Sequence, residues 1–211
     1  MINSVTQSPE PVQTRTRLSA DDRRSQLLAI GLGLLVQKPI HAFSLDDVAR
    51  KARISRGLLF HYFPNKSDYF HAVLDMAAQR VLDNTTPDPD ATPEQAMTQI
   101  VAGLFGQINR RRDFYLALLF GQGGLSMGGD RVANFRNDLA QRVMEVLGLD
   151  EADFAVTHAW IAYTEDRALQ WTEPPPAQRV GTMNGQVIHC IEALHRLVAA
   201  NHQLYQQERR P

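Results

Sequence analysis

Side chains that could bind DNA gather in one short stretch of the sequence, from Ser44 to Lys66. The guanidinium of Arg56 can form two parallel hydrogen bonds with the O6 and N7 atoms of guanine. Gly57 would let the backbone approach the groove closely, and Leu58 could pack against a thymine methyl group. Lys66 would place a positive charge and a helix N-terminus beside a phosphate. These residue types indicate a nucleic-acid interface.

The neighbouring side chains allow more than one interpretation. His61 and Tyr62 lie toward the far side of the same short helix, where they would reach backbone phosphates, although His61 is equally well explained as a surface residue. Phe60 is either a core residue or part of the wall that meets the groove. Arg56 itself could be a solvated helix charge.

Local signals divide this stretch into two short helices, a tight turn and the start of a third helix. Ser44 can accept a hydrogen bond from the Asp47 amide while the Asp47 carboxylate reaches back, which is a capping box. Arg53-Ile54 form the turn, and Ser55 and Asn65 are suited to cap the two helices that follow. Apolar residues after Ser44 recur at helical spacing: Leu45, Val48, Ala49 and Ala52. This is the layout of a helix-turn-helix.

The run Gly57–Lys66, GLLFHYFPNK, placed after Val48-Ala49 and Ser55, resembles the TetR family of bacterial transcriptional regulators. The resemblance is specific over Asp21–Asn84, and beyond it rests on length and an all-helical pattern. It implies an all-α fold with a cavity in the second domain, where a ligand changes the spacing of two DNA-reading heads. It also implies that five of the candidate residues contact DNA: Ser44, Arg56, Gly57, Tyr62 and Lys66.

Two residues depart from the family pattern. Arg53 stands where a glycine is usual in the turn, and a left-handed backbone there would cost an arginine about 1 kcal/mol. Phe60 stands where a tyrosine is usual, so a phosphate contact through a phenolic hydroxyl is lost. Phosphate contacts should therefore depend on Tyr62 and Lys66.

Charge is distributed unevenly along the 211 residues, although the net charge is only −1. Residues 1–66 carry ten lysines and arginines against five acidic residues, a net charge of +5, and residues 67–211 carry −6. A basic N-terminal part followed by an acidic remainder of the chain indicates a DNA-binding domain and a separate domain that binds another partner. Arg15 and Arg17 could form an arm in the minor groove, or belong to a disordered polar tail.

Composition favours a protein of the cytoplasm. The single cysteine, Cys190, excludes an internal disulfide framework and fits a reducing compartment. The N-terminus has no apolar segment of the kind found in secretory signals. The longest apolar run, Leu27 to Val36, is too short to cross a membrane, so we expect no membrane partner.

We predict four segments: a disordered arm (1–18), a helix-turn-helix domain (19–66), a connecting helix (67–84) and a helical ligand-binding and dimerisation domain (85–211). The proline-rich segment from Asn84 to Pro93 separates the last two. The helices are expected at Ala20–Gln37, Lys66–Asp83, Pro93–Arg110, Asp113–Gly121, Asp130–Leu147, Glu151–Thr172 and Pro175–Gln206, besides the two short ones of the helix-turn-helix.

The second domain is rich in aromatic residues, which are common both in cores and around small-molecule sites. The candidate ligand-binding residues are Phe105, Phe120, Trp160, Tyr163, Glu165 and Trp171. Glu165 could neutralise a cationic aromatic ligand, or it could form a salt bridge with Arg167 or Arg142, which the cost of burying an unpaired charge favours. The last two expected helices carry apolar residues suited to a four-helix dimer interface: Ile188, Ile191, Leu194, Leu197, Val198 and Ala199.

These features favour a dimeric regulator that binds a pseudo-palindromic double-stranded DNA operator and is released by a small, largely apolar or aromatic effector. We expect a repressor; an activator or a ligand-independent regulator is the alternative. A helical carrier or enzyme is a remote third class, because no Ser/His/Asp, metal or nucleotide constellation is present. Gly121–Gly129 lacks the lysine of a phosphate-binding loop, and His158 and His189 stand alone, so no cofactor or metal is expected.

Overall fold

The computed structural model describes residues 18–37, 43–112, 115–116 and 129–208. Over these residues the fold is all-α, as the sequence predicts, with no strand. The helices are α1 (Ala20–Gln37), α2 (Leu45–Ala52), α3 (Arg56–Tyr62), α4 (Lys66–Asn84), α5 (Pro93–Arg110), α7 (Gly129–Leu147), α8 (Phe154–Thr172) and α9 (Met183–Glu208), with short 3₁₀ helices at Glu151–Asp153 and Pro176–Gln178. The predicted arm (1–18) with Arg15 and Arg17, the Gly121–Gly129 loop, Phe120 and most of the expected helix 113–121 lie outside the described residues, apart from Leu18, Gly129 and residues 115–116.

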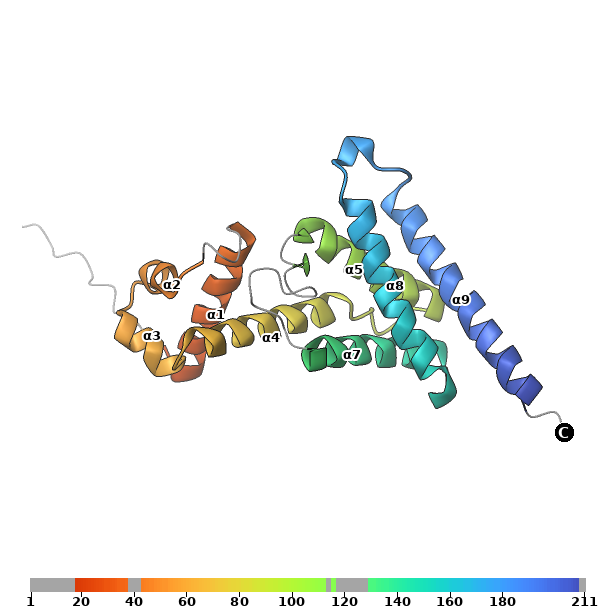
Figure 1. Cartoon of the computed structure of the whole chain (residues 1–211), viewed down its shortest axis with the longest axis horizontal. Helices are drawn as coiled ribbons and strands as arrows, with labels where there is room; N and C mark the ends of the chain where they lie inside the picture. The colour runs from red at the N-terminus through yellow and green to blue at the C-terminus, as the bar shows by residue number, and fades with distance from the viewer. Residues whose placement is uncertain (1–17, 38–42, 113–114, 117–128, 209–211) are drawn as a thin grey trace, which may run out of the picture.

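Helix α4 is long enough to belong to two hydrophobic cores, as Figure 1 shows by its course between the two groups of helices. Its residues from Tyr69 to Ala77 pack with α1, α2 and α3. Val81, near its other end, packs with α5, α7, α8 and α9. No helix over the described residues is long and apolar enough to cross a membrane.

Tyr69 joins α4 to α1 inside the first core. Its side chain is completely buried, and its hydroxyl donates a 2.7 Å hydrogen bond to the carbonyl oxygen of Leu27. Burial raises the pKa of the Tyr69 phenol, so the group stays a neutral donor. A Cβ atom at Gly31 would collide with the Tyr69 hydroxyl, whereas a Cβ atom at Gly33 would have no neighbour within 4 Å. Gly31 is therefore required by close packing.

The C-terminal end of α4 is held by α7. The Arg142 guanidinium donates through Nη1 to the carbonyl oxygen of Leu82 at 2.6 Å and to Thr85 Oγ1 at 2.9 Å. Thr85 is 1% exposed, and the two hydrogen bonds from Arg142 are partly buried. Arg142 thus adds a charged donor to the Leu82 carbonyl, which also accepts from the Thr85 amide and the Thr86 hydroxyl at this helix end.

Most predicted helix ends are confirmed to within two residues, and two helix starts are corrected. Helix α5 begins at Pro93 because Thr92 and Gln95 form a reciprocal capping box. The expected helix at Glu151–Thr172 is broken after a 3₁₀ turn, and α8 begins at Phe154. The expected helix at Pro175–Gln206 begins only at Met183, because the prolines form a separate 3₁₀ turn and Gly181 takes a left-handed φ of 74°.

The two glycines of α1 provide a matched test of the Tyr69 contact. Gly31→Ala should lower the free energy of unfolding by about 1–3 kcal/mol, because the added methyl group overpacks the core. Gly33→Ala should raise it by about 0.5–1 kcal/mol, because alanine favours the helix and the space is open. Urea denaturation followed by circular dichroism measures both. Equal effects of the two substitutions would contradict the contact.

Candidate nucleic-acid interface

Ser44 and Ser55 cap α2 and α3, on either side of the turn, as the sequence predicts. Ser44 Oγ accepts from the Asp47 amide at 3.2 Å and caps α2. Arg53 takes a left-handed conformation with φ 54° and ψ 47°. The Ile54 N–H then donates to the Ala49 carbonyl at 3.0 Å, which closes the helix as a Schellman motif. The cost of placing an arginine at this position is offset by the hydrogen bonds that end α2.

Helix α3 is anchored by one side of its surface and exposes the other. Ser55 Oγ caps it by accepting from the Leu58 amide at 3.1 Å, and Leu59 is fully buried. Phe60 and Tyr62 are half-buried against the first core. The predicted DNA-binding residues at the remaining positions are exposed: Arg56, Gly57, Leu58 and His61. A burial pattern of this kind leaves a free face suited to a groove.

Arg56 is held from two sides. Its Nη1 atom lies 3.3 Å from Asp46 Oδ1 and 3.4 Å from Oδ2, across the turn on α2. Its guanidinium carbon lies 5.4 Å from the centre of the Phe60 ring. Sequence reasoning did not single out Asp46. Its position in the first turn of α2, ten residues before Arg56, was the available signal.

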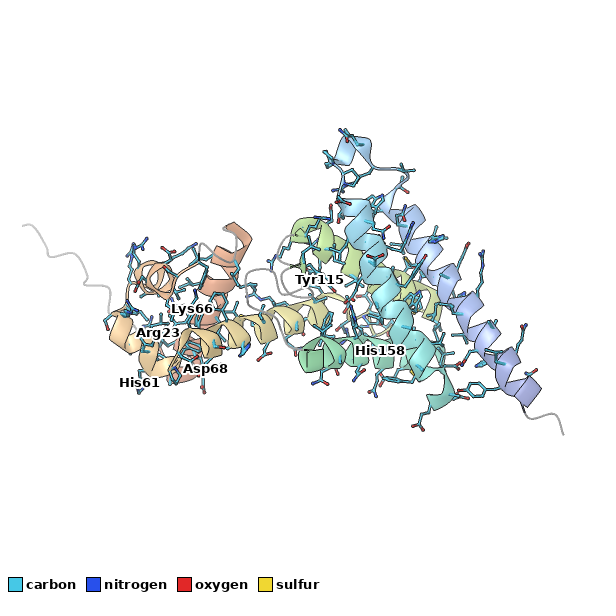
Figure 2. The ribbon with its side chains drawn as sticks, viewed as in Figure 1. Arg23, His61, Lys66, Asp68, Tyr115 and His158 are labelled. Carbon is cyan, nitrogen blue, oxygen red and sulfur yellow. The ribbon has the colours of Figure 1, made fainter. Side chains whose placement is uncertain are left out.

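Lys66 begins α4 at the edge of the same region, where Figure 2 labels it with His61 and Asp68. Asn65 caps the helix by accepting from the Asp68 amide at 2.9 Å. The Lys66 ammonium donates to the Phe43 carbonyl at 3.4 Å and lies 5.5 Å from the centre of the Phe70 ring. The Lys66 ammonium has three N–H donors, so the Phe43 carbonyl leaves donors that could bind a phosphate.

The structure places the predicted ligand-binding residues of the second domain in different environments. Phe105 and Trp160 are buried in the second core, and Trp160 donates to the Cys190 carbonyl at 2.7 Å. Tyr163 is 37% exposed, with its hydroxyl 2.8 Å from His189 Nε2 on α9. Trp171 is half-buried, 6.2 Å from Phe105 between ring centres. Phe120 lies outside the described residues.

Glu165 is paired, but with a partner other than the two predicted. Its Oε2 accepts from Arg136 Nε and Nη2, each at 2.7 Å, and its Oε1 accepts from the Tyr115 hydroxyl at 2.9 Å. Burial raises the pKa of Glu165, and Arg136 and Tyr115 oppose that rise. Arg136 lies 29 residues before Glu165, at a distance that helical spacing cannot predict.

The two arginines that the sequence suggested for Glu165 make other contacts. Arg142 binds the end of α4, and Arg167 donates to Gln186 Oε1 on α9. The prediction that Glu165 forms a salt bridge is therefore confirmed, but its partner is Arg136 and not Arg142 or Arg167. Both carboxylate oxygens of Glu165 have protein donors, which is the requirement for a stable buried charge.

Several cavities open between the described helices of the second domain. One of about 780 Å³ lies where α7, α8 and the end of α9 meet, and Met144, Leu149, Phe154, Tyr205, Glu145 and Glu151 are among the residues that line it. Another of about 310 Å³ includes Trp171, and one of about 290 Å³ lies between α5 and α9. Over the placed residues, no group of histidine, cysteine and acidic side chains could hold a metal ion.

Residues 27–73 match the model of the family described as "Bacterial regulatory proteins, tetR family". The chain is 35% identical over 95 residues to the HTH-type transcriptional regulator EthR of Mycolicibacterium smegmatis, which covers 40% of this chain and 44% of that one. It is 37% identical over 68 residues to the HTH-type transcriptional activator FasR of the same organism, covering 32% and 29%. The chain thus spans about half the length, or less, of these curated relatives.

A tetR-family transcriptional regulator from Streptomyces coelicolor has the same fold. Its crystal structure aligns with a TM-score of 0.74 over 89% of this chain and 85% of that one, at 21% identity. The relatives named here are regulators of transcription, not enzymes. The matched segment contains the α2–turn–α3 unit, with its exposed face. On these grounds, residues 27–73 of the chain carry the DNA-binding segment of the TetR family of bacterial regulatory proteins, and the described residues have the fold of a TetR-family regulator.

Proposed function

We propose that this protein is a ligand-responsive transcriptional regulator that binds a pseudo-palindromic operator as a dimer. The single observation that carries the proposal is the free face of α3, where Arg56, Leu58 and His61 are exposed while Leu59 anchors the helix. The net charge of +5 over residues 1–66 would attract the phosphate backbone. Residues 19–66 form the DNA-binding domain in this proposal, α4 connects it, and residues 85–211 form the partner domain.

The proposed contacts follow from where the side chains lie. Arg56 would form hydrogen bonds with guanine, and Leu58 would pack against a thymine methyl group. Gly57, which has no side chain, would let the α3 backbone come close to the groove. Tyr62 and Lys66 would bind phosphates. Ser44 and Ser55 use their hydroxyls as helix caps, so a DNA contact from either would be an additional one.

We infer a small, largely apolar or aromatic effector from the composition of the second domain. The 780 Å³ cavity falls within the range of small-molecule sites, and Met144, Phe154 and Tyr205 are among its lining residues. Effector binding would lower operator affinity by favouring a spacing of the two α3 helices that does not fit DNA.

Repressor and activator are both compatible with this DNA-binding part, and one matched relative carries the word activator in its name. We propose a repressor. Deletion of the gene in the host, with a reporter behind its target promoter, separates the two: target expression rises for a repressor and falls for an activator.

Two substitutions test the docking of α3. Arg56→Ala should cost about 1–3 kcal/mol of operator binding and relax preference at one base position. Lys66→Ala should weaken all sequences alike and make the dependence of affinity on salt less steep. Fluorescence anisotropy with labelled duplexes at several salt concentrations measures both. If neither variant changes operator affinity, α3 does not dock as proposed.

Gly57 allows a test that separates DNA binding from stability. A Cβ atom at Gly57 has only Ser55 Oγ within 4 Å, at 3.9 Å, so alanine fits the folded protein. Gly57→Ala should raise the free energy of unfolding by up to about 1 kcal/mol. It should weaken operator binding, because the methyl group would stand between the backbone and the groove. Unchanged affinity in a stabilised variant would show that α3 does not approach DNA at this residue.

Exposed apolar residues on α9 support the proposed dimer: Met183, Ile188, Leu197, Leu204 and Tyr205. Ile188 and Leu197 were expected there from the sequence, whereas Leu194 is fully buried in the chain's own core. Ile191 and Val198 are partly buried against that core and could serve both. Two such chains would present their α3 helices about 34–36 Å apart on one face of the DNA.

Leu197 is 42% exposed, which makes it suited to a test of the interface. Leu197→Glu should convert a micromolar dimer into a monomer, because a carboxylate would be buried without a partner. Asn134→Glu, an exposed position on α7, is the control for added charge. Sedimentation velocity reports the mass. If wild-type protein is a monomer at micromolar concentration, or the Leu197 variant stays a dimer, this interface is wrong.

A further inference from the structure

We propose that Asp46 is a specificity-determining residue of the DNA interface. Its carboxylate holds Arg56 in the pose that reads guanine and opposes binding to sequences in which Arg56 finds no guanine. The inference rests on the proposed function, since it requires α3 to lie in the major groove. Asp46 acts through Arg56 and is a positioning residue.

The first support is the geometry of the Arg56 side chain. The Asp46 carboxylate engages only Nη1, at 3.3 and 3.4 Å, and the Phe60 ring lies against the guanidinium at 5.4 Å. These are the contacts that Arg56 makes within the part of the chain that the structure describes. The edge formed by Nε and Nη2 is left for the paired acceptors of a guanine.

The second support is exposure. The side chain of Arg56 is 65% exposed and that of Asp46 is 56% exposed, so the pair lies open at the surface and is screened by water. An exposed ion pair of this kind adds little to stability. Its effect is on the arrangement of Arg56, a long side chain that loses much rotamer freedom when it is fixed on a base. Fixing it before binding reduces that loss.

The third support is the charge of Asp46 itself. A carboxylate at a DNA-binding surface repels phosphates, which disfavours binding to every sequence. At a guanine, Arg56 gains two hydrogen bonds that offset this repulsion. At other bases, an unrestrained Arg56 could turn to a phosphate and bind without regard to sequence, and Asp46 competes for that guanidinium. Asp46 therefore weakens non-specific binding more than specific binding.

Phe60 completes the arrangement. The family resemblance gives a tyrosine at this position, and this chain keeps the ring while losing the hydroxyl. The half-buried ring supplies a face for the guanidinium, in addition to the carboxylate contact that Asp46 makes at Nη1. Phe60→Tyr should keep base preference at the Arg56 position, and Phe60→Leu should reduce it.

The experiment compares two DNA probes with the full chain. One is a duplex selected by the wild-type protein from a randomised pool, and the other is a scrambled duplex of the same composition. Asp46→Asn should tighten binding to the scrambled duplex by about threefold, the scale of an exposed ion pair. The ratio of the two dissociation constants should fall by the same factor or more. Asp21→Asn, an exposed position in the first turn of α1, removes the same charge and should leave the ratio unchanged.

A double-mutant cycle identifies how Asp46 acts. In the Arg56→Ala background, Asp46→Asn should no longer change the ratio beyond the Asp21→Asn control. If it still does, Asp46 acts through its charge alone and the proposal is overturned. The proposal is also overturned if Asp46→Asn matches Asp21→Asn in the wild-type background while Arg56→Ala relaxes base preference. If Arg56→Ala leaves base preference unchanged, the result contradicts the proposed docking of α3, on which the role of Asp46 depends.

Discussion

The hydrogen bond from the Tyr69 hydroxyl to the Leu27 carbonyl fixes how the rest of the structure is placed. It crosses from α4 to α1 at the point where Gly31 leaves room for the ring. A buried hydroxyl without a partner would cost about 1–3 kcal/mol, so the two helices have one favourable register. Because α1 packs against α2 and α2 against α3, this register also sets where the exposed face of α3 points.

Helix α4 connects that register to the second domain. Lys66 lies at its first residue, beside the DNA-binding face, and Leu82 near its other end accepts from Arg142 of α7. Helix α7 in turn carries Arg136, six residues earlier, which binds Glu165 of α8. A ligand that moved α7 against α8 would therefore act, through Arg142, on the C-terminal end of α4, the helix whose first residue is Lys66. This is a physical route between the two proposed sites, through an element that both share.

Features set by neighbouring residues could be predicted from the sequence, and features set across the fold could not. The caps at Ser44, Ser55 and Asn65 were predicted because each needs only the amide three residues later. The start of α9 was missed, since a proline can begin a helix or a separate turn. The Glu165–Arg136 pair and the Tyr69–Leu27 bond join residues 29 and 42 apart, and no local pattern specifies which helix faces meet.

The two departures from the family pattern have opposite consequences for the interface. Arg53 bears the strain of a left-handed turn, but the Schellman hydrogen bonds keep it at the end of α2, so α3 is placed as a glycine would place it. Phe60 changes the interface itself, because a tyrosine there could bind a phosphate and a phenylalanine can only offer its ring. In this chain that ring lies under Arg56. Under the proposed docking, phenylalanine removes a phosphate contact that does not depend on DNA sequence and keeps the ring contact that orients Arg56. The balance then shifts from affinity toward selectivity.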